Sequence, residues 1–313
     1  MRIFIFSHIA DVDGVTPIIL SKLAFENIDY KLIDNPIDEI FLDYINNNDF
    51  SIYDYIFMTD LCISEDTINK LSDDFKKKFL IFDHHISNIK MNKYQFIKVV
   101  VEQNNKDESA TSIYYDYLVK NFKNELLIKE STKQLVDFVR ICDTYTFDKE
   151  NKEEAIYIAD FLSMVGINEY VEYFYNFIFN NNKFYFEEKL KYLFEVEEKR
   201  KKLYIEEKSK QVISCYIKPF NVGIVFAENY RSSLGNKLAK MYDDKYDFIV
   251  IINMSRSVSL RGIKDIDLNA FANIYGGKGH KKAAGFSLPE GLKEKVIKEI
   301  FKNIEIRNDE NER

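Results

Sequence analysis

The sequence predicts a two-domain α/β protein. An N-terminal parallel-sheet domain with a helical second half is joined by a helical linker to a smaller α/β domain. Three observations support this prediction: the chain of 313 residues is long for one core, apolar runs alternate with helix-length segments up to about residue 83, and the pattern turns helical from about 109 to 180. Strands separated by helix-length segments form βαβ units and therefore a parallel sheet.

Polar residues close three of the expected N-terminal strands. We expect strands at 2–8, 30–33, 53–60 and 78–83, and helices at 15–27, 37–45 and near 64–72. The first, third and fourth strands end on His8, Asp60 and Asp83. Ligands of open parallel sheets bind beyond the carboxyl ends of the strands, so these side chains are expected to converge there.

The rest of the chain divides into helices, a linker and a second domain. Aromatic stripes at spacings of three and four favour core-facing helices at 110–122, 131–145, 153–165 and 168–179. Alternating charges over 187–211 indicate a solvated linker helix. Strand-like runs at 212–217, 221–227, 246–254 and 257–263 then enclose helices at 232–242 and 269–275. The predicted limits are 1–186 for the first domain, 187–212 for the linker, 213–304 for the second domain and 305–313 for a frayed tail.

Composition limits the cellular location and the classes of binding partner that we expect. No segment approaches the roughly 20 apolar residues that cross a bilayer, so we expect no membrane partner and a cytoplasmic location. Cys62, Cys142 and Cys215 have no paired spacing, which fits a reducing compartment and small buried side chains. A net charge of -7 disfavours long nucleic acid, whose binding normally leaves a basic footprint. The sequence does not decide between a monomer and a homodimer.

The chain has only four histidines, His8, His84, His85 and His280, and none lies on an apolar helix face. Each follows a strand-like run or sits in a glycine-rich loop. A single histidine in such a place is usually a structural residue, but four of them together favour a functional cluster.

Carboxylates accompany these histidines. Asp11 and Asp13 precede a predicted helix and could simply cap it, because aspartate favours that position. Asp60, Asp83 and Asp143 make capping an insufficient explanation for the whole set. So many carboxylates at one sheet edge would repel one another unless cations neutralised them.

The ligand set is rich in oxygen, contains imidazoles and lacks thiolates. This set suits Mn²⁺ or Mg²⁺ better than structural zinc. Two such ions sharing a carboxylate promote in-line attack on phosphorus by a metal-activated hydroxide. The predicted chemistry is therefore hydrolysis of a phosphoric ester or anhydride.

A second cluster lies in "SVSLRGIKD" (257–265) and "YGGKGHKKAAGF" (275–286). Glycine-rich backbone approaches an anion closely, and neighbouring cationic side chains would hold it. A tight turn alone would also explain the glycines. With Arg261 at a strand end, the segment favours a phosphate or nucleotide clamp.

Together these motifs resemble the DHH phosphoesterase superfamily, in the branch with a C-terminal DHH-associated domain and its GGGH motif. The resemblance covers about residues 1–290. "SHIADVDGVTPIILSKLAF", "RICDTY" and "GGKGHKKAAGF" look most like the nanoRNase B type of short-oligonucleotide phosphodiesterase.

The resemblance implies a role for each motif residue. One metal would be held by His8, Asp11 and Asp60, and the other by Asp13, Asp60, His84 and Asp143, with Asp60 as the bridge. The catalytic pair would be His85, in contact with the scissile phosphate, and Asp83, which orients the imidazoles. Substrate phosphates or a terminal nucleotide would be bound across an interdomain cleft by Arg261, His280 and the backbone of Gly277 and Gly279.

The sequence departs from the family pattern twice. Two residues separate His8 from Asp11, where relatives show one or three. Lys278 replaces a glycine of the GGGH motif, which is compatible with an added phosphate contact or a changed loop.

The resemblance implies a Mn²⁺-dependent phosphodiesterase that converts short oligoribonucleotides or linear dinucleotides to mononucleotides. Mg²⁺ or Co²⁺ could replace Mn²⁺. Two alternatives within enzymes are hydrolysis of a cyclic dinucleotide and of 3′-phosphoadenosine 5′-phosphate. An alternative from another class is a nucleotide-sensing module without catalysis, which would be expected to lack some of these ligands.

Overall fold

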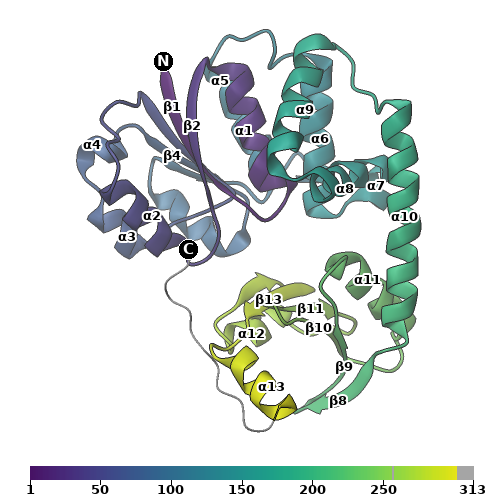
Figure 1. The fold of residues 1–313 in the computed structure, drawn as a ribbon. Coiled ribbons are helices and arrows are strands. Elements are labelled where there is room, and N and C mark those ends of the chain that lie inside the picture. The colour runs from purple at the N-terminus through teal and green to yellow at the C-terminus, as the bar shows by residue number, and fades with distance from the viewer. Residues whose placement is uncertain (256, 302–313) are drawn as a thin grey trace. The chain divides into compact units, whose positions relative to one another are not determined.

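The computed structural model describes residues 1–255 and 257–301 of the chain. It divides into two compact units, Met1–Phe194 and Glu195–Arg313. The division falls inside helix α10 (Glu188–Ser209), which occupies the predicted linker (Figure 1). The predicted domain limits remain predictions, and the predicted tail at 305–313 lies outside the described residues.

The first unit contains a five-stranded sheet in the order β2-β1-β3-β4-β5. All four strand pairings are parallel, which confirms the predicted fold class. The strands are β1 (Arg2–His8), β2 (Asn27–Ile33), β3 (Tyr55–Thr59), β4 (Phe79–Asp83) and β5 (Ile97–Val99). The chain moves outward from β1 to β2 and then returns to the other side of β1, so the topological switch point lies between β1 and β3.

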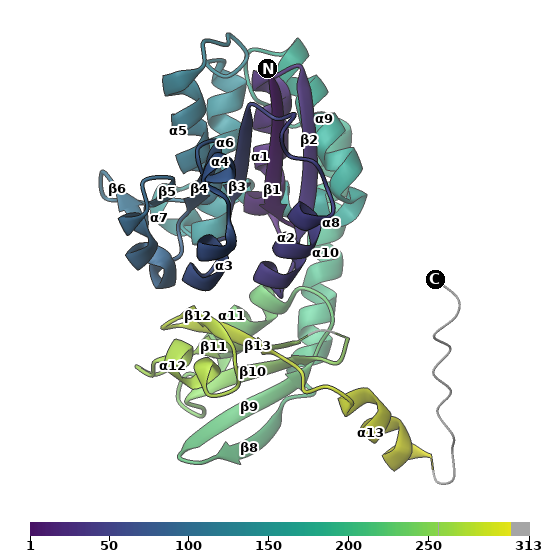
Figure 2. The same cartoon turned by 90° about the vertical axis from the view of Figure 1, so that its left-hand side faces the viewer.

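Helices cover both faces of this sheet (Figures 1 and 2). Successive strand residues face opposite sides, so Ile3 and Ile5 join one core while Phe4 and Phe6 join the other. The first core is closed by α1 (Val12–Ala24), α5 (Ala110–Asn121), α6 (Glu130–Thr144), α8 (Ile156–Val165) and α9 (Ile167–Asn180). The second is closed by α2 (Ile37–Asn46), α3 (Glu65–Lys70), α4 (Asp73–Lys76) and the 3₁₀ helix η1 (Ile86–Lys93).

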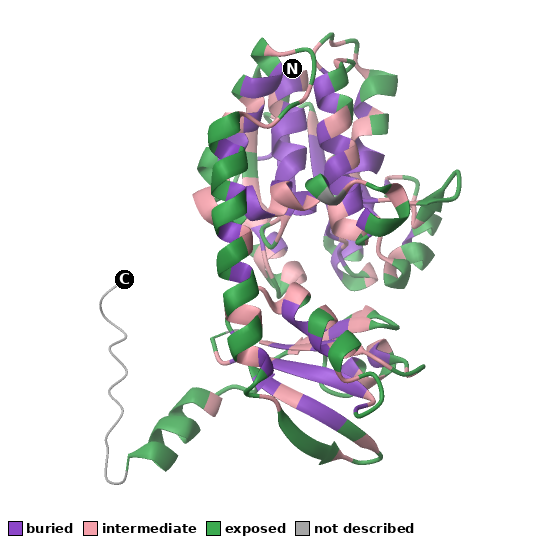
Figure 3. Cartoon of the chain, turned by 90° about the vertical axis from the view of Figure 1, so that its right-hand side faces the viewer, coloured by how far each residue is buried: buried purple, intermediate pink, exposed green. Residues whose placement is uncertain are grey.

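Short elements complete the first unit. They are β6 (Glu102–Gln103), β7 (Lys106–Asp107), α7 (Phe147–Glu150) and η2 (Glu153–Ala155). The sheet and α1 are mostly buried, whereas α10 exposes most of its surface (Figure 3). Within the described residues no helix is long and apolar enough to span a membrane.

The central helix α1 is buried along nearly its whole length and carries two unusual residues. Pro17 has no N–H, so the Asp13 carbonyl lacks its usual partner four residues ahead. The Thr111 hydroxyl donates to that carbonyl at 2.9 Å. At Gly14, a Cβ atom would lie 2.2 Å from the His8 carbonyl oxygen. Glycine therefore allows the start of α1 to lie against the end of β1.

The second unit is a six-stranded mixed sheet in the order β12-β13-β11-β10-β9-β8. Only β9 and β10 pair in parallel, and the other pairings are antiparallel. The strands are β8 (Ile213–Ile217), β9 (Phe220–Phe226), β10 (Phe248–Asn253), β11 (Ser257–Gly262), β12 (Lys278–His280) and β13 (Ala283–Ser287). Its helices are α11 (Arg231–Met241), α12 (Leu268–Asn273) and α13 (Leu292–Ile300).

Several boundaries differ from the predicted ones. Helix α1 begins at Val12 rather than residue 15 because Asp11 caps it. The helix expected near 64–72 is α3, which ends at Lys70, and a further helix, α4, begins at Asp73, because Ser64 and Ser72 each cap a new start. The glycine-rich turn contains an edge strand, β12. The predicted burial of the cysteines was wrong for Cys215, which is exposed on the edge strand β8, whereas Cys62 and Cys142 are half-buried.

The bond between Thr111 and Asp13 can be tested by substitution. Thr111→Val removes the hydroxyl and leaves the buried Asp13 carbonyl without its donor, whereas Thr111→Ser keeps the donor. We expect Thr111→Val to lower the free energy of unfolding in urea by roughly 1–3 kcal/mol more than Thr111→Ser. Equal losses in the two variants would show that this hydrogen bond contributes nothing to stability.

Candidate metal centre

Three neighbouring strands deliver the predicted site residues to one edge of the first sheet. His8 ends β1, Asp60 follows β3, and Asp83 ends β4 with His84 and His85 directly after it. The switch point of the sheet lies between β1 and β3, where open parallel sheets bind their ligands. The helices bring the remaining residues, Asp11 and Asp13 at the start of α1 and Asp143 near the end of α6.

Potential ligand atoms form three overlapping groups, within each of which they lie no more than 4.8 Å apart. The groups are His8, Asp11 and Asp60; Asp13, His84 and Asp143; and Asp60, His84 and His85. Asp60 and His84 each belong to two groups. The structure thus brings together seven of the eight residues predicted for metal binding and catalysis, and the eighth, Asp83, bonds to His85.

The first group combines capping with ligand geometry. Asp11 is the N-cap of α1 and accepts from the Gly14 amide at 3.1 Å, so the capping interpretation also holds for this residue. His8 Nδ1 lies 3.1 Å from Asp60 Oδ2. Burial, together with the charge of Asp60, raises the pKa of Asp11 to about 6. Because ligand atoms of His8 and Asp11 lie within 4.8 Å of each other, the segment at residues 9–11 accommodates the unusual spacing of these two residues.

Asp60 lies at the centre of the cluster in a rare backbone conformation. Its φ of 58° is in the left-handed region, and its side chain is buried. Burial by itself would raise the pKa of Asp60, but the bonds to His8 and His84 lower it. The carboxylate is thus held ionised between two imidazoles. Strained residues of this kind persist where the surrounding structure fixes them, often at functional sites.

The second group is anchored by the N-terminus of α5. Both oxygens of the buried Asp13 accept backbone amides, from Ala110 and Thr111, each at 2.8 Å. His84 Nε2 lies 3.8 Å from Asp13 Oδ2, 3.5 Å from Asp60 Oδ1 and 3.4 Å from Asp143 Oδ2. One imidazole nitrogen thus faces three carboxylates.

The charges of this group are unbalanced. Burial lowers the pKa of His84, but its bond to Asp60 and the charges of Asp143 and Asp13 raise it to about 11. Burial raises the pKa of Asp13, and the charge of Asp60 adds to the effect. Burial and the charge of Asp13 raise the pKa of Asp143 well above its usual range. The imidazole and the carboxylates thus all have raised pKa values, because the negative charge of the clustered carboxylates exceeds the positive charge of the described residues near them.

The donor set fits divalent cations. Asp143 Oδ2 is buried and finds no hydrogen-bond partner in the described chain, although such atoms are normally satisfied. The grouped donors are carboxylate oxygens and imidazole nitrogens, which suit Mn²⁺ or Mg²⁺. Burial raises the pKa of the neighbouring Cys142 thiol, so it stays protonated and is a poor ligand. A cation beside Asp143 would supply the missing partner.

Asp83 positions His85 rather than joining a ligand group. Its Oδ1 accepts the His84 amide at 2.8 Å and lies 2.7 Å from His85 Nδ1, and its Oδ2 accepts from Asn88 Nδ2 at 2.6 Å. Burial opposes ionisation of Asp83, but the bond to His85 lowers its pKa. An ionised Asp83 requires a proton on His85 Nδ1, which makes Nε2 the edge of the ring that can meet another group.

The predicted phosphate-binding residues of the second unit share one face of its sheet. His280 pairs with Ala283, and Ala283 pairs with Arg261, so the three lie in one row across β12, β13 and β11. Lys278 lies two residues from His280 and therefore on the same face. Arg261 donates from Nη2 to Ser232 Oγ at 2.8 Å. The structure thus gathers three cationic or imidazole side chains over small residues of β13.

Gly277 and Gly279 have packing reasons for being glycine. A Cβ at Gly277 would lie 2.2 Å from the Gly285 carbonyl oxygen, and one at Gly279 would lie 2.4 Å from Ala284 Cα. The amide of Gly277 donates to Ala272 O at 2.9 Å, and that of Gly279 donates to Asn269 Oδ1 at 3.0 Å. Both amides therefore have acceptors here, and their predicted contact with phosphate remains a prediction.

The sequence reasoning missed three contributors. Asp34 follows β2 at the same sheet edge. Burial lowers the pKa of His8, but the bond to Asp60 raises it, and the charge of Asp34 makes a smaller contribution in the same raising direction. The rule that selected the other strand ends would have found it. Ser109 caps α5 and is a recognisable helix-start residue. It did not indicate that the first amides of α5 would bind the carboxylate of Asp13. No pattern pointed to Asn88.

Family models match both units. The model described as the DHH family N-terminal domain matches residues 2–141, and the DHHA1 domain matches residues 224–305. Oligoribonuclease NrnB of Bacillus subtilis is 30% identical over 316 residues, which cover 97% of this chain and 77% of that protein.

Solved structures share the fold at low sequence identity. RecJ from Thermus thermophilus in complex with Mn²⁺ has a TM-score of 0.56 and 11% identity, covering 93% of this chain and 50% of that one. An exopolyphosphatase-related protein from Bacteroides fragilis has a TM-score of 0.52 and 13% identity, with coverage of 95% and 89%. PggH from Vibrio cholerae, a pGpG-specific phosphodiesterase, has a TM-score of 0.50 and 13% identity, with coverage of 96% and 97%. With the two family models and the NrnB match, the conclusion is that the chain belongs to the DHH family and is a phosphoesterase of the nanoRNase B type.

Proposed function

We propose that the protein is a Mn²⁺-dependent phosphodiesterase that hydrolyses short oligoribonucleotides or linear dinucleotides to mononucleotides. One observation carries the proposal: two candidate ligand groups meet at the buried carboxylate of Asp60. A carboxylate between two cations is the arrangement that two-metal hydrolases of phosphoric esters use. The similarity to an oligoribonuclease supports the substrate class.

His8, Asp11 and Asp60, which form one of the groups, would hold one ion. The other ion would be held by the group of Asp13, His84 and Asp143 together with Asp60, whose Oδ1 lies 3.5 Å from His84 Nε2. When bound, the two ions lower the pKa of water and neutralise charge on the phosphate. Mg²⁺ or Co²⁺ could serve in place of Mn²⁺, because the same oxygen and nitrogen donors accept them.

The chain's own residues position the substrate. Asp83 holds the Nδ1 edge of His85, so Nε2 is the atom proposed to contact the scissile phosphate. In the second unit, Arg261, Lys278 and His280 are proposed to bind further substrate phosphates.

The substrate is tested by a turnover panel with Mn²⁺, read by chromatography of the products. The panel contains 5′-labelled dinucleotides, oligoribonucleotides of increasing length, cyclic dinucleotides and 3′-phosphoadenosine 5′-phosphate. We expect mononucleotide release to be fastest from the shortest linear substrates. No Mn²⁺-stimulated release from any member would contradict the enzymatic proposal and favour a sensing role. Faster cleavage of cyclic dinucleotides or of 3′-phosphoadenosine 5′-phosphate would replace the proposed substrate.

Asp60→Asn tests the shared carboxylate. Asparagine tolerates the left-handed φ of 58°, so the backbone should be retained. Because one side chain serves both groups, we expect weaker binding of both ions in calorimetry and a loss of kcat of at least about 100-fold. The exposed Asp74→Asn on α4 is the matched control and should behave as the wild type. Loss of only one ion in Asp60→Asn would contradict the bridging role.

His84→Ala and His85→Ala test the division of labour between neighbours. His84 Nε2 faces three carboxylates, so its loss should remove one bound ion. His85 is bonded to Asp83, so its loss should leave both ions bound and reduce kcat by about 10²–10⁴-fold. His85 also lies near Asp60, with Nδ1 3.8 Å from Oδ1. Equal loss of metal in the two variants would therefore make His85 a ligand instead.

A further inference from the structure

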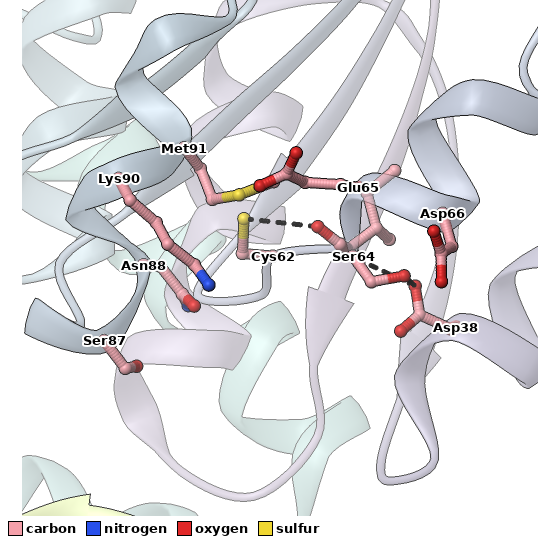
Figure 4. Close-up of a pocket in the computed structure, with 10 residues that line it drawn as sticks. Asp38, Cys62, Ser64, Glu65, Asp66, Ser87, Asn88, Lys90 and Met91 are labelled. Atoms are coloured by element: carbon pink, nitrogen blue, oxygen red, sulfur yellow. Dashed lines mark hydrogen bonds between the residues drawn. The ribbon is translucent and has the colours of Figure 1, made fainter.

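A pocket of about 420 Å³ opens beside the candidate metal centre within the first unit. In Figure 4, η1 supplies Ser87, Asn88, Lys90 and Met91 on one side, and Ser64 and Glu65 lie across from them. Its volume falls within the range of roughly 300–1,000 Å³ usual for small-molecule sites. None of these residues belongs to a candidate ligand group.

The η1 helix explains which side chains face the pocket. In a 3₁₀ helix, residues three apart lie in one column. Ser87 and Lys90 form one column and Asn88 and Met91 a second, and both columns line the pocket. The third column, Ile86 and Ile89, is directed elsewhere and is 57% and 52% exposed.

The pocket is physically tied to the predicted catalytic histidine. Asn88, in the pocket wall, donates to one oxygen of Asp83 at 2.6 Å, and the other oxygen lies 2.7 Å from His85 Nδ1. On the opposite side, Cys62 lines the pocket two residues after Asp60. A group attached to a phosphate at His85 therefore has the pocket within reach.

The lining identifies the class of ligand. Ile63 and Met91 are the apolar residues of the lining, and both belong to the second core, with exposed fractions of 1% and 3%. The sulfur atoms of Met91 and Cys62 are polarisable and make favourable contacts with aromatic rings. Lys90 and Ser87 add a polar rim. A flat ring with polar edges and an attached sugar matches this combination.

A cation is a poor match for the same pocket. Asp38 Oδ1 already accepts the Ser64 amide at 2.9 Å and the Ser64 hydroxyl at 3.2 Å. Glu65 Oε2 is paired with Lys93 at 2.5 Å. Asp66 is the third carboxylate of the lining. Asp38 and Glu65 thus hold the loop in place, and among the described residues none of the three carboxylates belongs to a candidate ligand group.

We infer that this pocket binds the nucleoside on one side of the scissile phosphate. The inference rests on the proposed nucleotide substrate and adds the place where one base is held. It assigns η1 two functions, because the segment that supports His85 through Asn88 and Asp83 also lines one side of the pocket.

Bulky substitutions on two faces of η1 provide a matched test. Ser87→Trp fills the pocket, and Lys90→Trp fills it from the same column as an independent variant. Ile89→Trp adds the same ring to the exposed column and is the control. Each is assayed with Mn²⁺ on the dinucleotide pApA and on two analogues in which either the 5′ or the 3′ base is replaced by hydrogen.

For the wild type, we expect removal of one particular base to lower kcat/KM by about tenfold or more. Ser87→Trp and Lys90→Trp should already have this lower kcat/KM with pApA. Removal of the same base should then lower kcat/KM no further in these two variants. Ile89→Trp should match the wild type. Retention of the full wild-type sensitivity to both bases in the two pocket variants would overturn the inference.

A binding measurement separates this inference from the proposed function. Calorimetry with AMP should show about tenfold weaker binding to Ser87→Trp and Lys90→Trp than to Ile89→Trp or the wild type. If the wild type does not cleave pApA, the proposed function fails, and the AMP titration still decides the pocket. Equal AMP affinity in all four proteins would overturn the nucleoside assignment.

Discussion

Repulsion among buried carboxylates at one edge of the first sheet explains how the elements around the candidate metal centre are built. Asp13 and Asp60 are almost completely buried, and the oxygens of both lie within 4 Å of His84 Nε2. Burial makes such a cluster costly unless cations or hydrogen-bond donors compensate it. The donors of the described residues satisfy Asp13 and Asp83 but leave Asp143 Oδ2 without a hydrogen bond. The remaining demand is one that bound metal would meet.

The elements around the cluster are shaped by the same demand. Helix α1 carries Asp11 and Asp13 and must start against the end of β1, which requires glycine at position 14. The N-terminus of α5 points two amides at Asp13, where the helix dipole also favours a negative charge. The backbone of Asp60 adopts a strained conformation at the centre. The burial of a large hydrophobic core around these positions offsets the free energy that the strained and buried residues cost.

Much of this arrangement could be predicted from the sequence. The alternation of apolar runs and helices indicated the parallel sheet, and polar strand ends indicated which residues converge. The prediction worked for His8, Asp60 and Asp83 because strand order and parallel pairing bring strand ends together whatever the loops do. It was weaker in the second unit, where β12 and β13 follow from pairing with distant partners rather than from local pattern.

What the sequence could not supply are contacts between segments far apart in the chain. The link from Pro17 through the Asp13 carbonyl to Thr111 joins residues almost 100 positions apart, and no motif around Thr111 indicates it. The 3₁₀ form of η1 is equally hidden, since "ISNIKMNK" has no clear period. Yet that form decides which side chains line the pocket, because a period of 3.0 separates Ser87 and Lys90 from Ile86 and Ile89. The lining of the pocket therefore depends on a backbone geometry that local propensity does not reveal.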